Sequence, residues 1–472
     1  MYNIVLNNVT KRYEYEELIK IFLPEDEFEV YALEQHRQGE YITPQELAEQ
    51  TGNLPDRLEF TLDGDTKTDK NKLKAQIYDR LSELTGQRPP WGTLTGVRPV
   101  KLAGMLSDPY REFTEDYRVS SDKAGELVDI YNYQQEKLGK PSENSAGIYV
   151  GIPFCPTRCL YCSFTSNQAG REAIDAYLEA LMLEIEAAGS GMAESGIIPE
   201  SIYIGGGTPT TLDEYQLNRL LSHIEKNINL ESIKEFTVEA GRPDTITEAK
   251  IQALSEHNID RISINPQTIK EETLHIIGRN HTNRQIYDAF SLARKYGLPV
   301  INCDLIAGLP EETPEDFKDT VNKVAELGAE NITVHTLAVK RASKLKDIDR
   351  DFHFRQAETV SQMLAAGREI LDDKGYRPYY LYRQKHTSGN TENIGFCRDD
   401  AVSVYNIRIM EEAQSILALG AGGISKIWFP AENRLERVAN VSNYEIYIDR
   451  LDEMMERKKN GFFGKIDGGK LC

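Results

Sequence analysis

Short apolar runs alternate with longer amphipathic segments between residues 147 and 337. Between the first two runs, Ile174, Leu178 and Leu181 recur at the spacing of one helical face, and helices are predicted in the other intervals as well. The last of these helices is expected to have Thr313 as its N-cap and Pro314 at its first position. Six strands joined by helices predict a parallel sheet with right-handed crossovers, which curls toward a barrel and carries its active site at the carboxyl ends of the strands. The predicted strands are residues 147–152, 201–204, 235–239, 261–265, 300–306 and 331–337.

The chain has 472 residues, which is more than one ordinary domain, and we expect three units. Residues 1–140 are predicted to form an N-terminal α/β extension, and residues 141–345 a partial barrel of six strand–helix units. Residues 346–472 are predicted to form a C-terminal domain that caps the substrate site. Within that domain we expect a helix at about 352–371 and a tyrosine-rich strand at 376–382.

Composition narrows the possible functions and locations. The formal net charge of −20 argues against a nucleic-acid partner, because phosphate binding needs a basic surface. The N-terminus has no signal-peptide pattern and no apolar run reaches the length of a membrane span, so we expect a cytoplasmic protein. Three of the six cysteines lie within eight residues, which indicates metal binding in a reducing compartment rather than a disulfide framework.

The clustered cysteines are Cys155, Cys159 and Cys162, in the run CPTRCLYC directly after the first predicted strand. Three thiolates at this spacing can hold three irons of a 4Fe-4S cube and leave the fourth iron open to a small molecule. The alternatives are a zinc knuckle or three unrelated core thiols. Zinc usually takes four ligands in paired CxxC units, and the sequence has no second pair. The segment resembles the radical S-adenosylmethionine (SAM) enzymes, and the resemblance implies a 4Fe-4S cluster and SAM as cofactors.

Polar residues recur where successive predicted strands end. A glycine run, Gly205 to Gly207, follows the second strand, Glu239 ends the third, Gln267 follows the fourth and Asp304 lies in the fifth. Each carboxylate or amide alone is more simply a paired core residue, and the glycine run alone could be a tight turn. Because unpaired polar groups are costly in apolar strands, several of them at successive strand ends indicate one shared polar site.

Four features narrow the resemblance: YVGIPFCPTRCLYC, GGGTPT, the pair Gln267 and Arg279, and DLIAGLP. Together they are similar to the oxygen-independent coproporphyrinogen III oxidase family, over about residues 149–424. The segments WGTLTGVRP and LALGAGGIS are similar to its branch of HemZ-type coproporphyrinogen dehydrogenases. The resemblance implies that the cluster is held by Cys155, Cys159 and Cys162, and that two SAM molecules contact residues Tyr149, Gly206, Gly207, Thr208, Glu239, Gln267, Arg279, Asp304, Ala338 and Ile424.

Two segments depart from the family pattern. Phe164 stands where well-studied oxidases have a fourth cysteine. The haem-chaperone branch has a motif HNxxYW, and here the comparable segment is HTSGNTENIGF, with Asn393 and Phe396. Neither the oxidase pattern nor the haem-carrier pattern is therefore complete.

The family resemblance implies an oxidative decarboxylation. A 5′-deoxyadenosyl radical would take hydrogen from the β-carbon of a propionate, and loss of carbon dioxide and one electron would leave a vinyl group. Two propionates of coproporphyrinogen III would react, giving protoporphyrinogen IX without oxygen. Four substrate carboxylates need cations, and the candidates are Lys340, Arg341, Arg383 and Lys385, each of which is as readily explained as solvated surface charge.

The expected partners are a small tetrapyrrole substrate and an electron donor such as flavodoxin or ferredoxin, with no nucleic acid and no membrane span. Two other functions stay open at the level of sequence. One is a different radical SAM enzyme acting on tetrapyrroles, such as a methyltransferase that opens haem. The other is a non-enzymatic haem-binding carrier with a vestigial cluster.

Overall fold

The computed structural model describes residues 1–34, 41–96, 98–162, 166–338, 356–384, 391–467 and 470–471. The chain forms two compact units, Met1–Asn132 and Tyr133–Cys472. None of the helices in these described ranges is long and apolar enough to cross a membrane.

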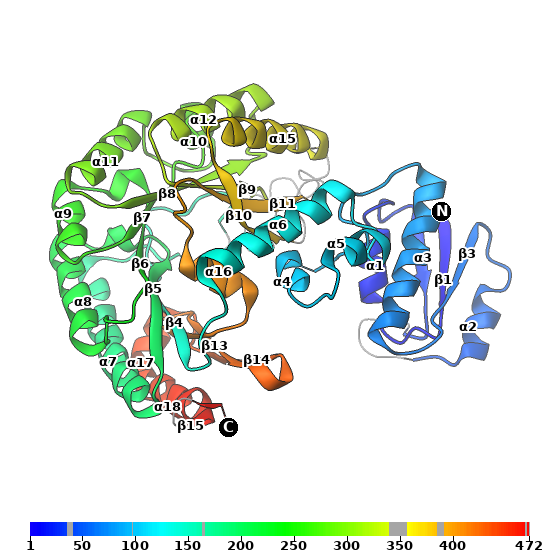
Figure 1. Ribbon diagram of the computed structural model, residues 1–472, viewed down its shortest axis with the longest axis horizontal. Coiled ribbons are helices and arrows are strands. Elements are labelled where there is room, and N and C mark those ends of the chain that lie inside the picture. The colour runs from blue at the N-terminus through cyan, green and yellow to red at the C-terminus, as the bar shows by residue number, and fades with distance from the viewer. Residues whose placement is uncertain are drawn as a thin grey trace. The chain divides into compact units, whose positions relative to one another are not determined.

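The first unit contains a three-stranded parallel sheet with the strand order β2-β1-β3 (Figure 1). Its core is apolar and combines side chains of β1 such as Ile4 and Leu6 with side chains of helix α3 such as Leu73 and Ile77. The elements are β1 (Tyr2–Asn7), α1 (Tyr13–Ile19), β2 (Phe28–Tyr31), α2 (Pro44–Thr51), β3 (Arg57–Thr61), α3 (Lys67–Thr85), α4 (Pro99–Ala103) and α5 (Pro109–Glu115). Helix α6 (Ser121–Leu138) follows and continues into the second unit.

The second unit is built on one eleven-stranded sheet with the order β10-β11-β9-β8-β7-β6-β5-β4-β12-β13-β14. The seven strands from β9 to β12 in this order are parallel to one another. The strands are β4 (Ser145–Ile152), β5 (Ile198–Gly206), β6 (Glu235–Gly241), β7 (Arg261–Ile264), β8 (Val300–Ala307), β9 (Asn331–Thr336), β10 (Arg377–Arg383), β11 (Glu392–Cys397), β12 (Ser415–Leu419), β13 (Ile424–Phe429) and β14 (Arg434–Ala439). A separate two-stranded sheet pairs β15 (Ile466–Asp467) with β16 (Lys470–Leu471).

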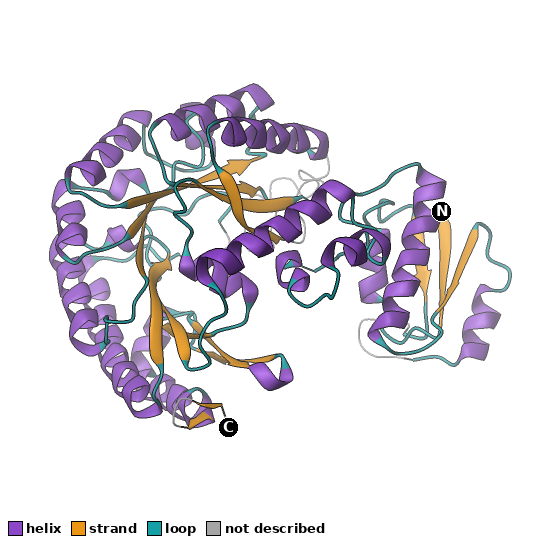
Figure 2. Cartoon of the chain, in the orientation of Figure 1, coloured by secondary structure: helices purple, strands orange, loops and turns teal. Residues whose placement is uncertain are grey.

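Helices cover the outer side of this curved sheet, as Figure 2 shows for the purple helices around the orange strands. The apolar faces that the sequence predicts for these helices are buried, for example Ile174, Leu178 and Leu181 on α7. The outer helices are α7 (Arg171–Ser195), α8 (Glu214–Asn227), α9 (Glu248–Glu256), α10 (Glu271–Ile276), α11 (Asn283–Lys295), α12 (Pro314–Glu326), α15 (Ala357–Asp373), α17 (Tyr444–Asp449) and α18 (Leu451–Gly461). Helix α16 (Val404–Glu411) lies instead on the inner side, where its Tyr405 stacks on Tyr203.

The predicted mixed α/β fold with a parallel sheet is confirmed, and all six predicted strands are present, each with its ends within a few residues of the predicted ones. Thr313 caps α12 as expected, accepting a hydrogen bond from the backbone N–H of Asp316, with Pro314 at the first position. Strands β10 to β14 do not form a sheet of their own. Strands β10 and β11 extend the sheet beyond β9, and β12 to β14 extend it beyond β4. The two boundaries between the three predicted domains and the capping role of residues 346–472 stay predictions.

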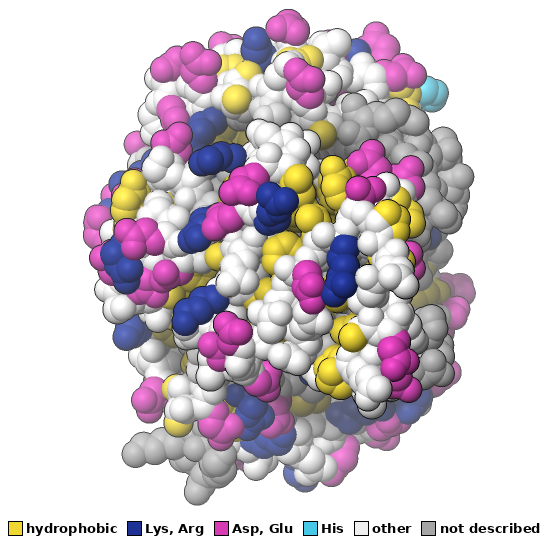
Figure 3. Space-filling view, turned by 90° about the vertical axis from the view of Figure 1, so that its right-hand side faces the viewer, with side chains coloured by type: hydrophobic (Ala, Val, Ile, Leu, Met, Phe, Trp, Pro, Cys, Tyr) yellow, Lys and Arg dark blue, Asp and Glu magenta, His cyan; other side chains and the backbone are white. Residues whose placement is uncertain are grey.

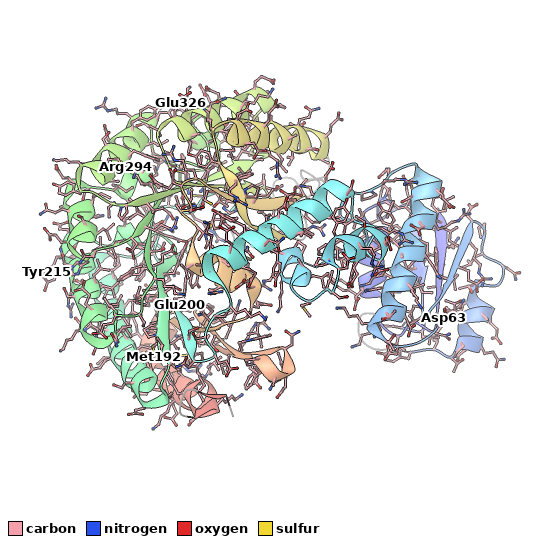
Figure 4. All side chains as sticks on the ribbon, in the orientation of Figure 1. Asp63, Met192, Glu200, Tyr215, Arg294 and Glu326 are labelled. Carbon is pink, nitrogen blue, oxygen red and sulfur yellow. The ribbon has the colours of Figure 1, made fainter. Side chains whose placement is uncertain are left out.

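Buried ion pairs tie the C-terminal segment to the amino ends of the parallel strands. Glu200 on β5, labelled in Figure 4, accepts hydrogen bonds from Arg408 of α16 at 2.9 and 3.2 Å. Glu235 on β6 accepts from both Nε and Nη2 of Arg261 on β7, at 3.0 and 2.9 Å. Both arginines are at most 4% exposed, so these pairs fix the sheet at the end opposite to the cysteine loop.

Candidate functional site

The three clustered cysteines lie in a loop that leaves the carboxyl end of β4. The loop is held by backbone hydrogen bonds, from Cys155 N–H to the carbonyl of Asn167 (3.0 Å) and from Cys162 N–H to the carbonyl of Cys159 (3.2 Å). Cys159 is buried, while Cys155 and Cys162 are partly accessible. Burial raises the pKa of Cys155, and the neighbouring Cys162 and Cys159 raise it further, so the three sulfurs lie within electrostatic reach of one another. Binding to iron cations would relieve that repulsion between thiolates.

The arrangement of the thiols differs from a site for a single metal ion. Within the described ranges, no three Cys, His, Asp or Glu side chains converge on one point. The cysteines of an iron–sulfur cube each bind a different iron, so their sulfurs need not converge. The three cysteines of the loop are the donor set that three corners of such a cube require.

The glycine run at the end of β5 packs against this cysteine loop. A Cβ on Gly207 would lie 2.4 Å from the carbonyl oxygen of Phe154, and Gly206 has a φ of +114° that side chains rarely adopt. The N–H of Gly207 donates to the carbonyl of Ile152 (2.8 Å), and that of Thr208 donates to the carbonyl of Phe154 (2.7 Å). The glycines are needed here for the fold, so a bulky residue at Gly206 would test the fold as much as the predicted SAM contact.

Six side chains form a row along the inner face of the sheet, one from each of β4, β5, β6, β8, β9 and β10. The strand register puts them on the same face, since Tyr149 pairs with Tyr203 and successive members are an even number of positions from register partners. All six keep some accessible surface. Burial also raises the pKa of Tyr149, Tyr203 and Tyr382, so these side chains are largely shielded from water. This inner-face row consists of Tyr149, Tyr203, Glu239, Asp304, His335 and Tyr382.

The two carboxyl groups of the inner-face row have opposite electrostatics. Burial raises the pKa of Glu239 from 4.5 to about 7, although the hydroxyl of Tyr203 donates a hydrogen bond to it. Burial also acts to raise the pKa of Asp304, but His335 and Asn302 beside it bring that pKa below its ordinary value. The Glu239 carboxyl therefore titrates near neutral pH, whereas Asp304 is a carboxylate at neutral pH.

Aromatic rings surround the Glu239 end of the inner-face row. Tyr203 stacks on Tyr405 of α16 with ring centroids 4.5 Å apart, and Tyr149 stacks on both at 6.3 Å. From the sequence, Tyr149 is a site residue only through the family resemblance, and Tyr203 and Tyr405 are not identified. The period-two pattern of strand β5 could have placed Tyr203 on the inner face, whereas Tyr405 lies on a distant helix.

Gln267 and Arg279 come together behind Asp304 and the cysteine loop. The N–H of Gln267 donates to the carbonyl of Asp304 (3.0 Å), and its φ is +68°. Arg279 donates to the backbone carbonyl of Asn265, and Cys159 beside it helps to raise its pKa against the effect of burial. In the described part of the chain, Oε1 of Gln267 and Nε of Arg279 are buried without a hydrogen-bond partner. Buried polar atoms with spare capacity are what a bound polar ligand would satisfy.

The remaining predicted SAM contacts lie at two further strand ends. Ala338 is buried and follows β9. Ile424 begins β13 with its side chain 47% exposed. The loop before it reaches the end of β4, because a Cβ on Gly420 would lie 2.7 Å from the carbonyl oxygen of Gly151. The structure therefore brings both positions to the carboxyl side of the parallel strands.

Of the four predicted carboxylate anchors, Lys340, Arg341 and Lys385 lie outside the described residues. Arg383 is 4% exposed and faces Glu392, its register partner across the β10–β11 ladder. Burial lowers the pKa of Arg383 to about 10, against the opposing effect of Glu392. It alternates along β10 with Tyr382 of the inner-face row, so it points to the other face of the sheet. A substrate contact by Arg383 stays a prediction.

Comparison with known proteins identifies the class first. Residues 149–324 match the family model of the radical SAM superfamily. The chain is 37% identical over 403 residues to the oxygen-independent coproporphyrinogen-III oxidase-like protein HemZ of Bacillus subtilis, covering 82% of this chain and 80% of that protein. It is also 35% identical over 308 residues to the heme chaperone HemW of the same species, covering 65% and 76% of the two chains.

A solved structure shares the fold. The coproporphyrinogen III oxidase HemN of Escherichia coli aligns with a TM-score of 0.53 at 24% identity, over 70% of this chain and 73% of that one. The chain thus belongs to the oxygen-independent coproporphyrinogen III oxidase-like family of radical SAM proteins, on the HemZ side. A 4Fe-4S cluster and SAM are the cofactors of this superfamily, and the cysteine loop and the spare polar atoms near it fit them.

Proposed function

We propose that the protein is a radical SAM enzyme that converts two propionates of coproporphyrinogen III to vinyl groups, giving protoporphyrinogen IX without oxygen. The observation that carries the proposal is the 37% identity with a coproporphyrinogen-III oxidase-like relative along 80% of that relative's length. The burial of the inner-face row supports it, because a reactive radical needs a site from which water is excluded.

In this proposal Cys155, Cys159 and Cys162 hold three irons of the cluster. When bound, the cluster and SAM supply a radical that abstracts a hydrogen atom. The chain supplies contacts to SAM from the strand ends, through the residues that the family resemblance names: Tyr149, Gly206, Gly207, Thr208, Glu239, Gln267, Arg279, Asp304, Ala338 and Ile424.

In this proposal the inner-face row positions the substrate. Hydrogen abstraction at a single β-carbon requires the substrate to be held to about 1 Å. Tyr382 and His335 lie beside Asp304, with His335 Nδ1 2.9 Å from the Tyr382 hydroxyl and Nε2 3.7 Å from Oδ1 of Asp304. Tyr382, His335 and Asp304 thus present polar atoms at one end of the inner-face row. At the other end, beside Glu239, the stacked rings of Tyr203 and Tyr405 offer a flat apolar surface.

Each of the two propionates reacts separately and by the same steps. The β-carbon loses a hydrogen atom, the bond to the carboxylate carbon breaks, and carbon dioxide leaves. The resulting carbon–carbon double bond forms as one electron passes to an acceptor. An electron donor such as flavodoxin or ferredoxin must reduce the cluster before each event, and a separate acceptor must take the electron released from the substrate.

The test is anaerobic reconstitution of the full chain, followed by incubation with SAM, a reductant and coproporphyrinogen III. Mass analysis of the porphyrin should show a monovinyl and then a divinyl product. The matched control is Cys159→Ala, purified and treated in the same way, which should give neither product nor SAM cleavage. If the wild-type chain holds the cluster and cleaves SAM but forms no vinyl product, the proposal is rejected.

A haem carrier is the second candidate, and the similarity to the heme chaperone HemW is the observation that favours it. In this case the chain would bind haem stably and would not cleave SAM in the presence of coproporphyrinogen III. Absorbance titration with haem, run beside the product assay, separates the two functions. Methyl transfer from SAM with consumption of haem would instead indicate another tetrapyrrole-acting radical SAM enzyme.

A further inference from the structure

We propose that the buried ion pair of Arg242 and Asp244 sets the reduction potential of the iron–sulfur cluster by acting on Cys159. The inference rests on the proposed function, because it requires the three cysteines to hold the cluster. Neither residue of the pair belongs to the predicted SAM contacts. Arg242 is instead a positioning residue, which acts on the cluster through the thiolate of one of its ligands.

Arg242 follows the last residue of β6 and is 3% exposed. Its Nη1 donates to the hydroxyl of Thr157 at 2.7 Å and to the backbone carbonyl of Thr157 at 3.4 Å. The same nitrogen lies 3.9 Å from the sulfur of Cys159, within hydrogen-bond reach of that larger atom. One edge of the guanidinium group therefore faces the cysteine loop.

The other edge of the guanidinium faces Asp244. Nε donates to Oδ1 at 3.0 Å and Nη2 donates to Oδ2 at 2.8 Å, which is a bidentate pair. Burial acts to raise the pKa of Asp244, but Arg242 brings it below its ordinary value, so the aspartate is ionised. The pair is a fixed dipole whose positive end is turned toward Cys159.

The backbone at the end of β6 holds this dipole in place. Gly241 has a φ of +56°, and the N–H of Arg242 donates to the carbonyl of Ala240 at 2.6 Å. A 3-10 turn, Pro243–Thr245, then carries Asp244 back toward Arg242. Thr245 donates from its hydroxyl to the carbonyl of Arg242 at 2.8 Å. Both charged side chains thus leave one tight turn and need little reorganisation when the charge of the cluster changes.

Two other ionisable groups face the same region. Arg279 contributes a second positive charge near Cys159. His281 is 3% exposed, and burial together with Arg279 lowers its pKa to about 3, so it is neutral. In the described part of the chain, Arg242 and Arg279 therefore both bring positive charge to Cys159, and Asp244 offsets the charge of Arg242.

The physical consequence follows from the charge of the cluster. Reduction adds one negative charge, and N–H donors or positive charges near a ligating sulfur stabilise the reduced form. The interaction is strong because the site is buried and screening by water is weak. Arg242 raises the potential, and Asp244, on the far edge of the guanidinium, lowers it. The opposing effects of Arg242 and Asp244 keep the cluster's potential between two limits. It is high enough for the cluster to accept an electron from its donor, and low enough for that electron to pass on to SAM.

The test uses opposite charge changes in the reconstituted holoenzyme. Arg242→Gln should shift the cluster's midpoint potential to a more negative value, and Asp244→Asn should shift it to a less negative value, in redox titrations followed by electron paramagnetic resonance. The double variant should lie between the two. A purely structural role would move both single variants in the same direction through solvent access.

A matched control is Arg261→Gln, which breaks the buried Arg261–Glu235 pair at the opposite end of the sheet. It should lower the melting temperature and leave the midpoint potential unchanged. If Arg242→Gln does not fold, Asp244→Asn alone decides the question through the sign of its shift.

Two results overturn the inference, and they are distinguishable from failure of the proposed function. Wild-type chain that incorporates no cluster contradicts both the cluster assignment and this inference. A complete cluster with shifts of equal sign, or with no shift in either variant, contradicts the inference alone. Iron content, measured on every variant before the titration, separates these cases.

Discussion

Two glutamates four residues apart on β6 have contrasting surroundings. Glu235, at the amino end of the strand, accepts hydrogen bonds from Arg261, and from the hydroxyl of Ser403 at 2.9 Å. Glu239, at the carboxyl end, has the Tyr203 hydroxyl as its side-chain partner, and burial raises its pKa to about 7. Both lie on the inner face of the same sheet. The fold pairs the buried charge at one end of the strand and keeps a carboxyl with a raised pKa at the other.

The surface provides a second contrast with this site. On the face shown in Figure 3, Lys and Arg side chains are scattered among Asp and Glu. Exposed ion pairs such as Arg284–Asp288 and Arg450–Glu453 contribute only ~0–1 kcal/mol each. The charges that matter for stability and chemistry are therefore the buried ones at the two ends of the sheet.

The largest effect is expected from the cysteine loop. Each change Cys155→Ala, Cys159→Ala or Cys162→Ala should abolish cluster incorporation and all SAM cleavage, because three ligands are the minimum for the cube. Iron content and visible absorbance measure the loss. Cys303→Ala and Cys397→Ala are the controls, since both side chains are buried within strands β8 and β11. Equal loss of iron in either control would contradict the ligand assignment.

The amino end should respond in stability rather than in chemistry. Arg261→Ala leaves the buried Glu235 without its bidentate partner and should cost about 3–5 kcal/mol of unfolding free energy. Denaturant unfolding of the apo chain measures this cost. At a temperature where the variant is folded, its affinity for SAM should equal that of the wild type. A variant with unchanged stability and reduced SAM affinity would remove the contrast between the two ends.

The carboxyl end should show a pH dependence that Glu239 controls. The pKa of Glu239 is raised from 4.5 to about 7 in the folded chain, so between these values the folded state binds more protons than the unfolded state. The contribution of Glu239 is therefore fully present below pH 4.5 and is lost as the pH rises through 7, by ~3 kcal/mol in total. Glu239→Gln should remove this slope in denaturant unfolding of the apo chain measured across pH 4.5 to 8. A slope that is the same in both proteins would contradict the raised pKa.

The smallest effect is expected from the partner of Glu239. Tyr203→Phe removes the hydroxyl that donates to the carboxyl but keeps the ring that stacks on Tyr405. Loss of one such hydrogen bond should change the unfolding free energy by ~0.5–1.5 kcal/mol and weaken SAM binding by less than about tenfold. Tyr215→Phe, on the exposed outer face of α8, is the matched control and should change neither quantity. Calorimetric SAM titration of both variants gives the comparison.

Much of this arrangement was predictable from local patterns. The strand that carries Glu235 and Glu239 alternates polar and apolar residues, and the cap at Thr313 needs only its own neighbours. The cysteine spacing lies within one loop. By contrast, nothing near Arg242 in the sequence names Thr157 or Cys159 as its contacts, and the buried arginines Arg261 and Arg408 carry no local mark that separates them from surface charges.

The sequence by itself determined the order of strands and helices, the cysteine loop and the family, because each depends on residues close together in the chain or on a matching motif. The tertiary structure alone decided which polar groups meet. Arg242 reaches Cys159 across 83 positions, and Arg408 reaches Glu200 across 208. It also decided that Arg383 turns to Glu392 while Tyr382 joins the inner-face row. The physical reason is that the register between distant strands sets the face and the partner of a buried polar side chain, and that register is fixed only when the whole sheet assembles.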